Sequence, residues 1–85
     1  MTQTEIDDIV SAELAVGIGH RPGVFVSGDG PRFTAQVGEW VEPVELASAA
    51  QRIAERLHST DPAVEVLLSI ATPWYIRGGR VDPVD

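Results

Sequence analysis

The residues from Gly38 to Leu57 constrain the fold more than any other part of the chain, because an apolar strand end runs directly into an amphipathic helix there. Pro43 suits the first position of that helix, where a backbone N–H would have no partner within the helix. The helix is predicted from about Val44 to His58. Its apolar stripe recurs at offsets of four, seven and eleven residues, as one face of a helix requires: Leu46, Ala50, Ile53 and Leu57.

A second helix is predicted near the start of the chain. Thr4, followed three residues later by Asp7, forms a capping-box pattern in which the Thr4 side chain accepts from a free backbone N–H. This pattern predicts a helix that opens at Glu5 and runs to about Val16. Its apolar face consists of Ile6, Ile9, Val10 and Leu14.

Three strands are predicted from alternating apolar residues. Residues 24–26 and 32–37 flank the turn-rich segment Ser27 to Pro31, so we expect these two strands to form an antiparallel hairpin. A last strand is predicted over residues 64–70, and Pro73 is expected to end it.

The predicted fold class is α+β, in the order helix, strand, strand, helix, strand. Two helices packed on one face of a small three-stranded sheet let every apolar face share one core, which leaves the other sheet face open. We expect one domain over residues 1–85, with a loose C-terminal tail over residues 72–85. That tail contains Gly78, Gly79 and Pro83, which interrupt regular structure.

The charge composition limits the partners that this chain is expected to bind. Thirteen acidic residues against six arginines and no lysine give a net charge of −7. A surface of that sign repels phosphate backbones and anionic lipid head groups, so neither direct nucleic-acid binding nor direct membrane insertion is predicted. The chain has no cysteine, its first ten residues lack the pattern of a signal peptide, and the protein is expected to be cytoplasmic.

No constellation of residues predicts catalysis, a metal site or a cofactor. The glycines of Gly17 to Gly23 precede a strand, whereas a dinucleotide-binding loop follows one. His58 is explained by its place at a helix C-terminus, where a protonated imidazole interacts well with the dipole. His20 lies in the glycine loop and has no neighbouring nucleophile, so its use as an acid or base is an alternative and not the leading interpretation.

Large aromatic residues near strand ends are the best candidates for binding a partner. Trp74 and Tyr75 either close the small core or anchor a partner surface, and the sequence leaves both possibilities open. Leu67 is expected on the mixed face of the last strand. The predicted partner-binding residues are therefore Trp74, Tyr75, Leu67 and His20, whereas Trp40 is expected to lie closer to the core.

The chain from about Ile6 to Ile70 resembles the alkaline-shock-protein family of small bacterial domains. The similarity rests on Pro22-Gly23-Val24 after the first helix, on Phe33 to Val37, on the junction from Trp40 to Val44, and on Val64-Glu65-Val66. The resemblance implies a non-enzymatic protein linked to cell-envelope stress, which associates with itself and is held near the membrane by a separate anchor protein. It assigns no functional residue.

The leading hypothesis is therefore a non-enzymatic, envelope-stress-associated interaction protein that acts through self-association and a membrane-anchored partner. One alternative is an acidic inhibitor or immunity-type protein that blocks a basic partner by charge complementarity. Another is a small ligand-binding or enzyme subunit that uses His20.

Overall fold

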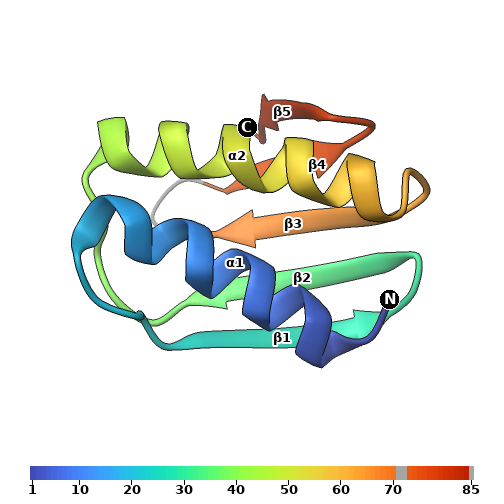
Figure 1. Ribbon diagram of the computed structural model, residues 1–85, viewed down its shortest axis with the longest axis horizontal. Helices are drawn as coiled ribbons and strands as arrows, with labels where there is room; N and C mark the ends of the chain where they lie inside the picture. Colours follow the sequence, from blue (N-terminus) through green and yellow to red (C-terminus); the bar gives the residue numbers. More distant parts are fainter. Residues whose placement is uncertain (71–72, 85) are drawn as a thin grey trace.

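A mixed five-stranded sheet carries two helices on one of its faces (Figure 1). The computed structural model describes residues 1–70 and 73–84. The sheet follows the chain order β1-β2-β3-β4-β5; β2 and β3 are parallel, and the other neighbours are antiparallel. The elements are α1 Gln3–Ile18, β1 Val24–Asp29, β2 Arg32–Val37, α2 Pro43–Thr60, β3 Glu65–Ser69, β4 Trp74–Arg77 and β5 Arg80–Pro83.

Helix α1 begins earlier than the sequence predicts, because the capping box lies at Thr2 and not at Thr4. The backbone N–H of Glu5 donates to Thr2 Oγ1 at 3.2 Å, and the N–H of Thr2 donates to Glu5 Oε1 at 3.0 Å. Thr4 and Asp7 lie inside the helix, where the Ser11 hydroxyl donates to Asp7 Oδ1 at 2.8 Å. Both pairs share the same spacing, but the glutamate side chain is the longer one and reaches back to the cap.

The apolar stripe of α2 is confirmed. Pro43 occupies the start of the helix, and the four predicted stripe residues are buried together with Ala49 and Ala54. They face the inward side chains of the three central strands, which are Phe33, Ala35, Val37, Val66, Leu68 and Ile76. One continuous core therefore lies between the helices and the sheet.

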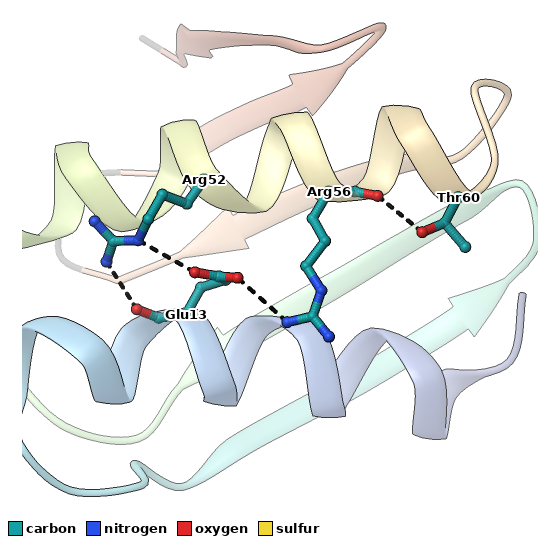
Figure 2. A network of polar contacts seen from close by, with 4 residues as sticks. All are labelled: Glu13, Arg52, Arg56 and Thr60. Atoms are coloured by element: carbon teal, nitrogen blue, oxygen red, sulfur yellow. Dashed lines mark hydrogen bonds and ion pairs between the residues drawn. The ribbon is translucent and has the colours of Figure 1, made fainter.

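The two helices are also joined by a polar network, which Figure 2 shows. Glu13 on α1 accepts from Arg52 Nε at 3.2 Å and from Arg56 at 3.2 Å, and its main-chain carbonyl accepts from Arg52 Nη2 at 2.9 Å. The Thr60 hydroxyl donates to the carbonyl of Arg56 at 2.9 Å. Because the Glu13 side chain is only 16% exposed, these bonds replace water that it has lost.

The prediction of three strands is wrong, since the chain after β3 adds two more. Trp74–Arg77 pairs with β3, and Arg80–Pro83 pairs with β4, so these residues are strands and not the loose tail that was expected over 72–85. Gly78 and Gly79 have φ angles of 57° and 76° and link the two strands in a tight turn. A two-residue turn with two positive φ angles matches the twist of a hairpin, so these glycines form the turn instead of ending the structure. Residues 72 and 85 of the expected tail lie outside the described residues.

Candidate functional site

The sheet face opposite the helices is the candidate site, and no helix in the described part of the chain covers it (Figure 1). Alternation along each strand turns every second side chain to this face, where neighbouring strands align them in rows. We call it the open sheet face. Its rows are Phe25, Gln36 and Ser69; Ser27, Thr34, Leu67, Tyr75 and Asp82; and Asp29, Arg32, Glu65, Arg77 and Arg80.

The open sheet face is formally neutral although the chain is strongly acidic. It carries three acidic residues and three arginines, so the net charge of −7 lies entirely on the rest of the protein. Because its acids and arginines balance, this face does not repel partners of either sign, and Phe25 and Tyr75 add the aromatic area in which protein interfaces are enriched.

One end of this face is organised around the Glu65 carboxylate of the central strand β3, which is 18% exposed. Tyr75 donates its hydroxyl to Oε1 at 2.6 Å, Arg32 Nε donates to Oε2 at 3.1 Å, and Arg77 lies 3.9 Å from Oε1. The guanidinium of Arg77 also lies 5.2 Å from the centre of the Tyr75 ring.

These contacts shift the ionisation of both partners. The hydrogen bond from Tyr75 and then the bond and charge of Arg32 lower the pKa of Glu65 below 4.5 against the opposing effect of burial. The same hydrogen bond, followed by burial and the charge of Glu65, raises the pKa of Tyr75 above 10.0. Glu65 is therefore held as an anion and Tyr75 as a neutral donor at neutral pH, so the pair is a fixed recognition feature.

Two exposed aromatic residues lie at the other end of the face. Phe25 is 69% exposed and Trp40 is 67% exposed. The Phe25 ring lies over Gly38, since its Cε2 atom is 3.4 Å from the position that a β-carbon at Gly38 would take. Exposed aromatic rings bind partners well, because they bury a large area at a small cost in side-chain entropy.

Two hollows accompany these residues. One of about 310 Å³ lies where β2 and β3 end, and its lining includes Gln36, Ser69, Trp40 and Glu39. The other, of about 200 Å³, lies over the Tyr75–Glu65 cluster. Both are shallow and lie along the open sheet face, so they offer recesses for partner side chains.

His20 lies just after α1, and its Nε2 atom is 2.9 Å from Oε2 of Glu39. This contact links the loop before β1 to the loop after β2, beside the larger hollow. A histidine next to a carboxylate is held in one orientation, but no nucleophile completes a catalytic arrangement with it among the hydrogen-bonded contacts of the described residues.

The structure brings together only part of the predicted partner-binding set. Leu67 and Tyr75 are direct neighbours across β3 and β4. Trp74 pairs with inward-facing Leu68 and packs against the core from the helix side, and its buried Nε1 has no hydrogen-bond partner in the described chain. His20 contacts Glu39 instead. The partner-binding role of all four residues stays a prediction.

Sequence reasoning missed Phe25 and misplaced Trp40. Val24 and Val26 flank Phe25, and strand alternation puts Phe25 on the opposite face from both. The sequence pattern was therefore enough to predict that Phe25 points away from the core. Trp40 was expected near the core, but β2 ends at Val37 and the following loop turns Val41 inward instead. A tryptophan in a loop is not constrained by strand alternation.

Within residues 1–70 and 73–84, no three or more histidine, aspartate or glutamate side chains are grouped so as to hold a metal ion. In the same part of the chain, neither helix has both the length and the apolar character needed to cross a membrane.

Comparison with known proteins yields no relative. No family model, no curated protein and no solved structure matches this chain.

Proposed function

We propose that this protein is a non-enzymatic interaction module that binds a protein partner through the open sheet face and also associates with itself. The observation that carries the proposal is the exposure of Phe25 on an uncovered, formally neutral sheet face, and of Trp40 in the loop at the end of that face, in an otherwise acidic molecule. Exposed aromatics beside hollows are the usual anchors of protein interfaces. The ordered Tyr75–Glu65 pair supplies fixed polar contacts toward the other end of the same face.

The identity of the partner is a further part of the proposal. The resemblance to the alkaline-shock-protein family favours a small membrane-anchored protein and a role in envelope stress. A partner of this kind would hold an acidic protein near a membrane whose anionic head groups repel it. The proposal therefore places the attraction in protein contacts and not in lipid binding.

The test is a comparison of captured partners. Wild-type protein and the Trp40→Ser variant are immobilised separately, and proteins retained from an extract of the native host are quantified. We expect Trp40→Ser to reduce retention of the main partner at least tenfold without lowering thermal stability, because an exposed residue contributes little to folding. The matched control is Val44→Ser, since Val44 is 73% exposed but belongs to α2. Equal loss of retention in both variants would refute the role of the open sheet face.

The acidic-inhibitor hypothesis is the second candidate, and the segregation of charge favours it. All of the excess negative charge lies away from the open sheet face. An inhibitor of this kind would bind through α1, which carries four acidic residues and no basic one, so Glu5→Gln and Asp8→Asn would weaken binding and added salt would weaken it steeply. Binding that depends on Trp40 and changes little with salt would exclude this candidate.

A further inference from the structure

The two edges of the sheet differ in how they are protected against an added strand. Edge strand β5 is four residues long and carries Arg80, Asp82 and Pro83, which are the charges and proline that block strand addition. Edge strand β1 is six residues long and reads Val-Phe-Val-Ser-Gly before its single charge at Asp29. It therefore lacks these protections over most of its length.

The hydrogen-bond phase of the β1–β2 hairpin identifies the free backbone groups of β1. The N–H of Gly38 donates to the carbonyl of Gly23 at 2.8 Å, and these residues lie opposite each other in the register of the hairpin. Hydrogen-bonded pairs alternate along an antiparallel ladder, so the groups of Val24, Val26 and Gly28 point away from β2. Among the described residues, one side chain reaches these groups, since Gln3 Nε2 donates to the Gly28 carbonyl at 2.9 Å.

We propose that a second copy of this chain adds to this edge, antiparallel to β1, with Val26 opposite its own counterpart. Two-fold symmetry about Val26 then sets each Phe25 opposite the small Ser27 of the other copy on the open sheet face. On the helix side it sets each Val24 opposite Gly28. The edge is therefore complementary to itself in size, as an interface between identical subunits requires.

Charge also favours the antiparallel arrangement. Arg21 lies just before β1 and Asp29 ends it, so antiparallel pairing brings the basic end of each copy beside the acidic end of the other. Asp29 makes no ion pair within residues 1–70 and 73–84. In that same part of the chain Arg21 bonds only to the exposed Asp8, at 3.0 Å, and it can exchange that partner at little cost. A parallel arrangement would set like charges side by side.

The expected dimer is weak. A single six-residue edge with one exposed aromatic ring from each copy buries less than the roughly 1,200 Å² typical of stable complexes. Both α1 helices also lie over the same face of the joined sheet, and their exposed acids, Glu5 and Asp8, repel each other. A dissociation constant between about 1 μM and 1 mM is expected, and added salt should strengthen association.

A proline at Val26 tests the edge directly. Val26→Pro removes an N–H that points away from β2, so it blocks the added strand and spares the β1–β2 ladder. Val81→Pro is the matched control. The N–H of Val84 donates to the Pro73 carbonyl, so the N–H of Val81 also points away from its neighbour strand, and both valines pack against the core. In sedimentation equilibrium we expect Val26→Pro to raise the dissociation constant at least tenfold and Val81→Pro to change it less than about twofold.

A cysteine experiment tests the register without proline and exploits the absence of native cysteine. Phe25→Cys and Ser27→Cys chains of different mass are mixed and oxidised. Residues 25 and 27 of opposite copies would form a non-hydrogen-bonded pair, whose short spacing allows a disulfide. We expect the mixed dimer to exceed both homodimers. Predominant homodimers, or an effect of Val81→Pro equal to that of Val26→Pro, would overturn the proposed edge.

The inference rests on the self-association part of the proposed function, and the same experiments separate the two. Self-association that persists in Val26→Pro, together with wild-type Val24 and Val26 amide resonances that do not shift with concentration, would overturn the edge but leave self-association intact. A strictly monomeric wild type at about 1 mM would overturn both the edge and self-association. Partner capture that depends on Trp40 would still stand in either case.

Discussion

The hydroxyl of Tyr75 bonds diagonally to Glu65, at 2.6 Å, although the residue directly opposite Tyr75 across β3 and β4 is Leu67. The diagonal contact is within reach of a tyrosine side chain. It fixes the Glu65 carboxylate between Tyr75 and Arg32. This end of the open sheet face is thereby ordered before any partner arrives.

Removing the Tyr75 hydroxyl should change how the free energy of unfolding depends on pH in the acid range. Because the folded state lowers the pKa of Glu65, the unfolded state binds more protons near pH 4.5. The stability that Glu65 contributes is therefore complete above pH 4.5 and is lost as the pH falls through the lower folded value. Tyr75→Phe removes the hydrogen bond that contributes most to the lowered pKa of Glu65, so this pKa should rise toward 4.5. The variant should then lose less stability than the wild type when the pH is lowered. Carboxyl NMR titration measures the pKa of Glu65, and urea unfolding at several pH values measures the stability.

The control is Arg77→Gln, which removes only the charge of Arg77, a smaller cause of the lowered pKa of Glu65. This variant should move the pKa less than Tyr75→Phe does, and an equal movement would contradict the dominant role of the Tyr75 hydrogen bond.

The polar network between the helices should contribute measurably to stability. Glu13→Gln keeps the shape of the side chain but removes the charge that Arg52 and Arg56 share. We expect a loss of about 1–2 kcal/mol in the free energy of unfolding, since hydrogen bonds to a charged, half-buried group are stronger than neutral ones. The control is Asp8→Asn in an exposed ion pair, for which about 0.5 kcal/mol or less is expected. Urea denaturation that gave equal losses would show that burial of Glu13 adds nothing.

The two tryptophans should behave in opposite ways. Trp74 packs against the core, so Trp74→Ala should lower the free energy of unfolding by about 2–4 kcal/mol, whereas Trp40→Ala should change it by less than about 0.5 kcal/mol. Acrylamide should quench the fluorescence of the Trp74→Phe variant, which retains Trp40, more strongly than that of Trp40→Phe. Stronger quenching of Trp74 would contradict the arrangement described above.

Gly28 should tolerate substitution less well than Gly19, although both have positive φ angles. A β-carbon at Gly28 would lie 2.6 Å from the carbonyl oxygen of Arg32, which is backbone and cannot move aside. At Gly19, the residue that ends α1, such a carbon would meet nothing within 4 Å. We expect Gly28→Ala to cost at least about 2 kcal/mol and Gly19→Ala about 1 kcal/mol in thermal or urea unfolding. Similar losses would mean that only the φ angle matters.

Much of the fold follows from local patterns in the sequence, but the C-terminal hairpin of β4 and β5 does not. The stripe of α2 and the alternation of β2 are strong periodic signals, and both correspond to buried residues. Trp74–Arg77 and Arg80–Pro83 are four residues each, too short for a clear period. Their turn, Gly78-Gly79, is ambiguous, because paired glycines occur both in loose tails and in tight hairpins.

The candidate site was harder to predict because it depends on pairing between distant strands. Leu67 and Tyr75 were named from single-strand patterns and proved to be neighbours. The contact of Glu65 with Arg32 joins residues 33 positions apart, and only the parallel pairing of β2 with β3 brings them together. No local pattern in the sequence carries that information.

The parallel pairing of β2 with β3 also has a consequence for the order in which the chain folds. The β1–β2 and β4–β5 hairpins are local, whereas β2 and β3 meet only after the chain has passed through all of α2. Closing that long connection carries the largest loss of chain entropy, so it should set the folding rate. Truncating Phe33 or Val66 should then slow refolding, whereas truncating Val81 in the terminal hairpin should mainly speed unfolding. The last hairpin would therefore set the unfolding rate, and so the lifetime of the folded state, while it has little effect on the folding rate.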